Sequence, residues 1–173
     1  MSASIDQLLK SSGLPLTDGA PANGDGVRKF YLHAGHLYAA SEPTEIITIL
    51  GSCVSVCLFD AARGVGGVNH FMLPGESPTP SPRYAKNAVD MLLAQLAALG
   101  ARRSRIQAKL FGGASVLKIA TESHHDLGGR NIEAARIKLA EERIPVVSED
   151  VGGIRGRKLV FSTADGTVLV RQV

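Results

Sequence analysis

A cysteine and a histidine are the residues of this sequence best suited to chemistry as a pair. Cys53 follows Gly51-Ser52 at a glycine break in an apolar run, and His70 lies in the sequence Asn69-His70-Phe71-Met72-Leu73-Pro74. An imidazole can take the proton of a nearby thiol, and the thiolate is the nucleophilic form of cysteine. The two residues therefore predict nucleophilic catalysis, provided that the fold brings them together.

A β-hairpin is the element expected to bring them together. Asp60-Ala61-Ala62-Arg63-Gly64 is a turn sequence between two apolar runs. If Asp60–Arg63 form a four-residue loop, Cys53 lies directly opposite His70, with Cβ atoms roughly 5 Å apart. This proximity predicts a depressed pKa for the Cys53 thiol. A slip of one residue would instead turn His70 to the other face of the sheet.

The same residue types also have purely structural uses. Cysteine is often a small buried hydrophobe, and Cys57 is interpreted in that way. A histidine in a strand is often a satisfied core or edge residue. His33 and His36 are three residues apart, and His124-His125 are adjacent, but neither pair has the spacing of a zinc site. We expect both pairs at the surface and no metal site.

The order of elements along the chain predicts an α+β fold. Strands are expected at Phe30–Leu37, Glu45–Phe59, Val65–Leu73, Ile106–Phe111, Ile144–Val147, Lys158–Ser162 and Thr167–Val170. Ser81-Pro82 should begin a helix that stops at Gly100, and Asn131 should cap a second helix over Ile132–Glu142. Two helices among long β-rich stretches favour an α+β or layered α/β domain.

Composition limits the class of protein. The chain has 173 residues, 45% of them hydrophobic, and a net charge of +3, which suits one folded domain over 28–173 after a flexible leader over 1–27. The N-terminus lacks the pattern of a signal peptide, and the apolar runs are too short to span a membrane, so we expect a cytoplasmic protein with no membrane insertion. Basic residues are not interleaved with aromatic ones, which argues against nucleic acid as a partner.

Five short motifs occur in a fixed order and together resemble one known family. They are Leu50-Gly51-Ser52-Cys53-Val54, Asn69–Pro74, Lys109–Ala114, Gly129-Arg130-Asn131, and Asp150-Val-Gly-Gly with Gly156-Arg157. In this order they resemble the CheD family of chemoreceptor glutamine deamidases. The resemblance covers Phe30 to Val170, nearly the whole of the expected folded part.

The resemblance implies a reaction and a fold. The reaction is hydrolysis of the side-chain amide of selected receptor glutamines to glutamate and ammonia, with Cys53 as nucleophile and His70 as base. A threonine shortly before the cysteine orients the histidine in the family, and Thr48 is the candidate here, if a bulge at Gly51 turns it to the same face. Without such a bulge, Ser52, Ser55, Asn69 or a backbone carbonyl would have to take that role. The implied fold is a layered α/β/β sandwich like that of toxin-type cysteine deamidases, and no metal or organic cofactor is required.

The resemblance also implies a substrate surface and partners. We expect Ser52, Asn69, Phe111-Gly112-Gly113, Arg130 and Asn131 to bind the helical cytoplasmic region of methyl-accepting chemotaxis receptors. The alternative uses of these residues are a close backbone turn for Phe111-Gly112-Gly113 and helix capping or a plain surface charge for Arg130. The alternative functions are a non-catalytic chemotaxis adaptor that binds a CheC-type phosphatase, and a cysteine protease or amidase with another substrate.

Overall fold

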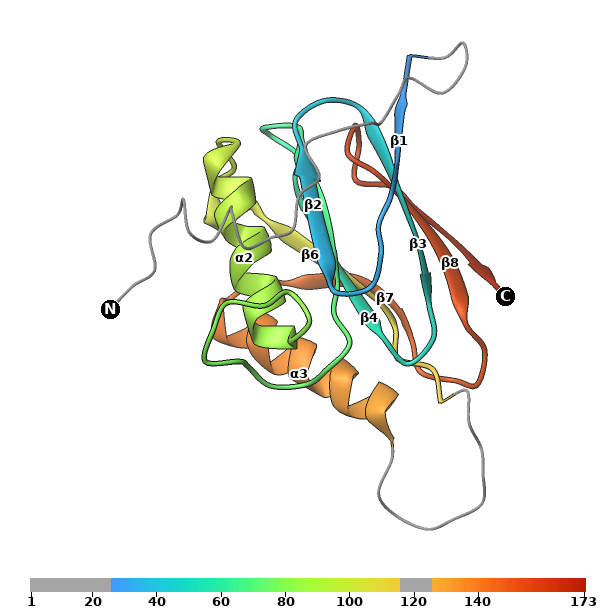
Figure 1. Cartoon of the computed structure of the whole chain (residues 1–173). Helices are drawn as coiled ribbons and strands as arrows, with labels where there is room; N and C mark the ends of the chain where they lie inside the picture. Colours follow the sequence, from blue (N-terminus) through green and yellow to red (C-terminus); the bar gives the residue numbers. More distant parts are fainter. Residues whose placement is uncertain (1–25, 116–125) are drawn as a thin grey trace.

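Three layers make up the fold in a computed structural model that describes residues 26–115 and 126–173 (Figure 1). The central sheet has the strand order β2-β5-β4-β6-β7, and the outer sheet has the order β1-β3-β8-β9. Two helices cover the face of the central sheet that points away from the outer sheet. The expected α/β/β arrangement is therefore confirmed. The predicted leader over 1–27 lies outside the described residues, except for its last two.

The bounds of the elements are as follows. The central sheet is formed by β2 (His36–Ala40), β4 (Val54–Asp60), β5 (Val65–His70), β6 (Gln107–Gly112) and β7 (Val146–Val151). The outer sheet is formed by β1 (Arg28–Tyr31), β3 (Thr44–Leu50), β8 (Arg157–Ser162) and β9 (Val168–Gln172). The helices are α2 (Ala85–Ala98), α3 (Leu127–Glu141) and the short 3-10 helix η1 (Arg103–Arg105). Among the described residues, no helix is long and apolar enough to cross a membrane.

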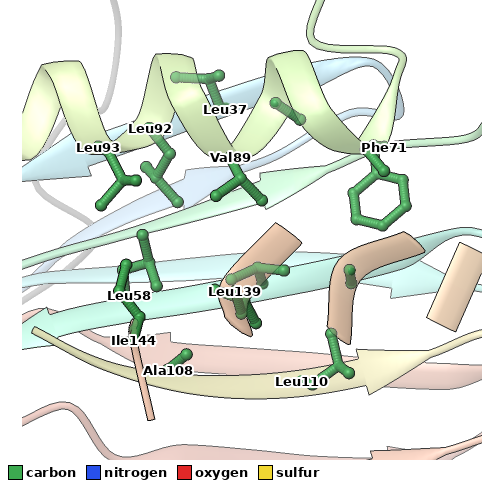
Figure 2. Packing of buried hydrophobic residues seen from close by; sticks show 14 of the residues in the cluster. Leu37, Leu58, Phe71, Val89, Leu92, Leu93, Ala108, Leu110, Leu139 and Ile144 are labelled. Carbon is green, nitrogen blue, oxygen red and sulfur yellow. The ribbon is translucent and has the colours of Figure 1, made fainter. Parts of the chain in front are cut away.

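One hydrophobic core lies between the helices and the central sheet (Figure 2). Val89 and Leu92 of α2 are fully buried, and Leu139 of α3 belongs to the same cluster as Leu58 and Leu110 of the sheet. Burial of each such side chain contributes about 1.5–3 kcal/mol of hydrophobic free energy. The helical spacing of the apolar residues in α2 thus has the core-covering role that the sequence predicts.

A second core lies between the two sheets. It contains Ile46 and Leu50 of β3, Phe161 of β8, and Val68 and Cys57 of the central sheet. Strand β4 therefore buries both of its faces, since its alternate residues belong to the two cores. Burial raises the pKa of the Cys57 thiol, although the charge of Lys109 opposes the rise. The interpretation of Cys57 as a buried small hydrophobe is confirmed.

Two predicted strands are in fact strand pairs that cross from one sheet to the other. The run predicted as Phe30–Leu37 divides into β1 and β2, with Gly35 at φ +76° in the crossing, and the run Glu45–Phe59 divides into β3 and β4 at residues 51–53. At the second crossing the flanking residues Leu50 and Val54 are both fully buried, so the apolar pattern continues through it. A glycine in such a run is compatible with a bulge or a crossing, and the sequence alone does not distinguish them.

Helix α2 begins later than predicted and helix α3 begins earlier, because groups other than the predicted caps accept hydrogen bonds from the N–H groups of their first turns. Helix α2 begins at Ala85, where the Leu73 carbonyl accepts from the N–H of Ala85 at 2.9 Å. Helix α3 begins at Leu127, and the Asp126 side chain caps it by accepting from the N–H of Gly129 at 2.8 Å. Asn131 is therefore a residue within the helix and not its cap.

Candidate active site

The hairpin that carries the candidate nucleophile and base has a different register from the predicted one. Asp60 pairs with Val65, and Val54 pairs with Phe71, so the four-residue loop is 61–64 and not 60–63. The loop begins one residue later because the Asp60 carboxylate accepts from the N–H groups of Ala62 and Arg102 and so keeps Asp60 in the strand.

The corrected register still places the two residues on one face. His70 is level with Ser55, and Cys53 lies two positions further along the same side of the hairpin. Such diagonal neighbours are roughly 7 Å apart. The face is the one between the two sheets, where Cys53 packs against the inter-sheet core and His70 is only 4% exposed.

Thr48 holds the imidazole of His70 from the opposite sheet. Its Oγ1 donates to the Leu32 carbonyl at 2.8 Å and lies 2.8 Å from Nδ1 of His70. A threonine hydroxyl has one proton and a carbonyl oxygen can only accept, so the hydroxyl must accept from an Nδ1–H. This leaves Nε2 of the neutral imidazole unprotonated. Thr48 reaches His70 because the chain crosses between sheets after Leu50, and the expected bulge at Gly51 is not the reason.

His70 lies in an environment that favours the neutral imidazole. Burial lowers its pKa to about 4, and the charges of His36 and His33 act in the same direction. His36 is the direct partner of His70 in the β2–β5 ladder. His33 is exposed, as predicted, and His36 is half-buried beside His70, whereas His124 and His125 lie outside the described residues.

Cys53 is a neutral thiol in this environment. Burial raises its pKa, and the backbone N–H of Cys53 itself opposes the rise. The predicted depressed pKa is therefore wrong, because the neutral His70 supplies no positive charge to stabilise a thiolate. The arrangement has instead an uncharged thiol and an uncharged base, so proton transfer must accompany nucleophilic attack.

The backbone around Cys53 is fixed by the end of β6 and the two residues that follow it. The carbonyl of Gly51 accepts from Ala114 N at 2.9 Å, and the carbonyl of Cys53 accepts from Gly113 N at 2.8 Å. Gly112 has φ +104°, and a Cβ there would lie 2.3 Å from the Cys53 oxygen. The close approach of β6 to Cys53 thus requires glycine at this position.

The residues expected to contact substrate differ widely in exposure. Phe111, Gly112 and Gly113 are buried beside Cys53, so their direct contact with substrate stays a prediction. Ser52 is half-buried and Arg130 is exposed.

The two asparagines in that set are fully buried. The Asn69 side chain accepts from Val56 N at 2.9 Å, and the amide of Asn131 donates to the carbonyls of Ser52 and Met72 at 3.0 Å each. Both amides therefore bind the chain itself in this structure.

Sequence reasoning missed three partners of the site. The Leu32 carbonyl fixes the Thr48 proton, the Met72 carbonyl accepts from Asn131, and His36 lies beside His70. The two carbonyls leave no trace in the residue types. His36 could be noticed in the sequence as a histidine in a strand-forming segment, three residues after His33. The pairing of β2 with β5, which brings it to His70, could not.

These features define a class of site. A thiol and an imidazole with an unprotonated Nε2 share one face, and a buried hydroxyl holds the imidazole in one orientation. That is the geometry of a cysteine-dependent hydrolase, in which histidine serves as the base.

Comparison with known proteins gives the family. The family model described as CheD chemotactic sensory transduction matches residues 72–172. A probable chemoreceptor glutamine deamidase CheD 1 of Anaeromyxobacter dehalogenans is 45% identical over 172 residues, which cover 96% of this chain and 100% of that one. A probable chemoreceptor glutamine deamidase CheD of Trichlorobacter lovleyi is 45% identical over 86% of this chain and 92% of that one. The chain belongs to the CheD family.

A solved structure from Neisseria meningitidis also matches, but distantly. Its TM-score is 0.40, with 14% identity over 75% of this chain and 64% of that chain.

Proposed function

We propose that this protein is a protein-glutamine deamidase that converts selected glutamines of chemoreceptors to glutamate and so tunes chemotaxis signalling. The relatives from Anaeromyxobacter dehalogenans and Trichlorobacter lovleyi are named as probable chemoreceptor glutamine deamidases. The observation that carries the proposal is the hydrogen bond between Thr48 and His70, because it leaves Nε2 of a neutral imidazole available to the thiol of Cys53. The proposed substrate is the helical cytoplasmic region of methyl-accepting receptors, and the proposed location is the cytoplasm.

The first half of the reaction forms a thioester. Nε2 of His70 takes the thiol proton as Sγ of Cys53 bonds to Cδ of the glutamine, and the carbonyl electron pair moves onto Oε1. Backbone N–H groups beside Cys53 stabilise the resulting oxyanion. When the oxyanion collapses, the Cδ–Nε2 bond of the glutamine breaks, and the nitrogen leaves as ammonia with the proton from His70.

The second half releases the product. A water molecule loses a proton to Nε2 of His70 and attacks the thioester carbon, and the proton then returns to the departing Sγ of Cys53. Glutamate is released and both residues regain their starting protonation states. Neither half requires a permanent charge on His70, which agrees with the lowered pKa of its imidazole.

Mass spectrometry of a receptor fragment tests the proposal directly. The purified chain is incubated with the cytoplasmic fragment of a chemoreceptor, and peptides are examined for the mass increase of an amide-to-acid change at glutamine. We expect conversion with release of ammonia and no cleavage of the receptor backbone. Backbone cleavage would indicate a protease, and an unmodified fragment would contradict the proposal. Cys53→Ala serves as the inactive control.

Binding of a CheC-type phosphatase is a separate proposal that rests on the sequence resemblance alone. It is tested by titrating a CheC-type protein into wild type and into Cys53→Ala. Binding by both, together with receptor conversion by wild type only, would show that the chain is an enzyme that also has this partner. Binding without any receptor conversion would favour the adaptor.

A further inference from the structure

The buried amide of Asn131 joins the segment that carries the nucleophile to the segment that carries the base. Its Nδ2 donates at 3.0 Å to the carbonyl of Ser52, which precedes Cys53, and at 3.0 Å to the carbonyl of Met72, two residues after His70. Because carbonyl oxygens only accept, the two contacts fix which end of the amide carries the hydrogens. Both hydrogens are used within the chain, so they are not available to a substrate.

The position of this bridge is the open end of the β4–β5 ladder. The last backbone pair of the hairpin is Val54 with Phe71, joined by hydrogen bonds of 3.1 and 3.0 Å. Continuation of that register places Cys53 level with Met72. The backbone hydrogen bonds between β4 and β5 have ended here, and the side chain of Asn131 on α3 bridges the two chain segments instead. It holds them together at the level of Cys53.

The same hydrogen bond fixes the orientation of one peptide group. In a trans peptide the C=O of Ser52 and the N–H of Cys53 point in opposite directions, and the described residues contain no cis peptide. The carbonyls of Gly51 and Cys53 are held by the backbone N–H groups of Ala114 and Gly113, which follow β6. Within the described residues, only Asn131 holds the Ser52 carbonyl between them.

The N–H groups of this loop remain available to a ligand. Those of Ser52 and Cys53 donate to no oxygen within residues 26–115 and 126–173. The Cys53 N–H belongs to the same trans peptide as the Ser52 carbonyl, which Asn131 holds. This N–H therefore points away from Asn131, toward the open side of the loop, where it can donate to the oxyanion oxygen of an acyl group bonded to Sγ.

Burial of Asn131 also has an unfavourable contribution to stability, which a role in packing alone does not explain. Its Oδ1 is fully buried and has no hydrogen-bond partner among the described residues. A buried acceptor without a partner costs about 1–3 kcal/mol, and an apolar side chain would avoid that cost. The unpaired oxygen indicates that the residue serves through its two donors.

We infer that Asn131 is a positioning residue, which aims the Cys53 N–H at the oxyanion through its hydrogen bond to the Ser52 carbonyl. The inference rests on the proposed function for its biological reaction, but it applies to any acyl transfer at Cys53. It replaces the expectation that Asn131 binds substrate. A donor to the Ser52 carbonyl also polarises the peptide, which strengthens the N–H on its other side.

The experiment compares two reactions of the same thiol. Acylation of Cys53 by p-nitrophenyl acetate passes through an oxyanion, whereas alkylation by iodoacetamide does not. In Asn131→Leu we expect acylation to fall about 100-fold, the loss typical of one oxyanion donor, with little change in alkylation. Cys53→Ala gives the background of both reactions, and Glu133→Gln, exposed on the same helix, is the matched control.

A second variant covers the case in which Asn131→Leu does not fold. In Asn131→Asp the ionised carboxylate cannot donate, but the protonated carboxyl can donate once, so the ratio of acylation to alkylation should recover as the pH falls. The inference would be overturned if a folded variant had the same ratio of acylation to alkylation as wild type. It would also be overturned if both reactions fell equally and the melting temperature fell with them. Failure of the proposed function gives a different result, namely normal acylation of wild type with an unmodified receptor fragment.

Discussion

Thr48 and His70 belong to different sheets, yet Oγ1 of the first lies 2.8 Å from Nδ1 of the second. The relationship depends on the packing of the outer sheet against the central one, since β3 carries Thr48 and β5 carries His70. The Thr48 hydroxyl donates its hydrogen bond to the Leu32 carbonyl. These two residues of the outer layer therefore fix both the orientation of the imidazole and the position of its proton. The two sheets must therefore stay packed together for His70 to be held in the orientation of a base.

Replacement of Thr48 tests this relationship. Thr48→Val keeps the shape but leaves the buried Nδ1–H without an acceptor, which costs about 1–3 kcal/mol. We expect deamidation to fall about 10- to 100-fold, because the tautomer with a free Nε2 is no longer favoured. Thr48→Ser keeps the hydroxyl and should retain most activity.

Nitrogen NMR of His70 gives a readout independent of activity. Wild type and Thr48→Ser should show a protonated Nδ1 and an unprotonated Nε2 at neutral pH. Thr48→Val should show a mixture of tautomers. A protonated Nε2 in wild type would contradict the hydrogen-bond assignment, whatever the activity of the variants.

The pH dependence of the reaction should reflect the lowered pKa of His70, which burial brings to about 4. The base is active when neutral, so kcat/KM should stay level from neutral pH down to about one unit above that value. A half-maximal rate near 6.5, the ordinary value of histidine, would contradict this expectation. In the double variant His33→Gln with His36→Gln, two repelling charges are absent, so the acid midpoint should move upward.

Stability should also depend on His70 at acid pH. Its pKa is about 4 in the folded chain and 6.5 without the fold, so between these values the unfolded chain binds a proton that the folded chain does not. The free energy of unfolding therefore falls as the pH drops through this window, by up to about 3 kcal/mol, and is unaffected above it.

Urea unfolding of wild type and His70→Gln near neutral pH and at pH about 4.5 measures this contribution. The difference in unfolding free energy between the two proteins should shift in favour of the variant at the lower pH. A difference that stays constant would show that the imidazole is protonated as readily in the fold as outside it.

The sequence predicts the layers and the reactive pair better than it predicts how they meet. Alternation and helical spacing identify the strands and helices, because those patterns reflect which faces are buried. The crossing at 51–53 is hidden, because residues on both sides of it are apolar, and with it the route by which Thr48 reaches His70. The hairpin register is missed because the Asp60 carboxylate, and not the turn residues alone, sets where the loop begins.

The two cysteines should differ sharply in reactivity. Cys53 is half-buried at the site, while Cys57 is 1% exposed in the core between the sheets and has a pKa raised by burial. Iodoacetamide should modify only Cys53 in the folded protein, as peptide mapping would show. Cys53→Ala should abolish deamidation, whereas Cys57→Ala should retain it with a modest loss of stability from the small cavity. Deamidation by Cys53→Ala would disprove the mechanism.

Gly112 should support the fold around Cys53, which is the alternative to its expected part in a surface for docking the receptor. A Cβ at this position would lie 2.3 Å from the Cys53 oxygen, and φ is +104°. Gly112→Ala should therefore lower the melting temperature and reduce both receptor turnover and iodoacetamide labelling of Cys53.

Gly64→Ala is the matched control, because Gly64 also has a positive φ, +67°, but a Cβ there meets no atom within 4 Å. The control should lose only about 1 kcal/mol of stability through backbone strain, with normal labelling. If Gly112→Ala labels as fast as the control but turns over the receptor more slowly, the backbone near Cys53 tolerates the side chain, and Gly112 contacts the receptor after all.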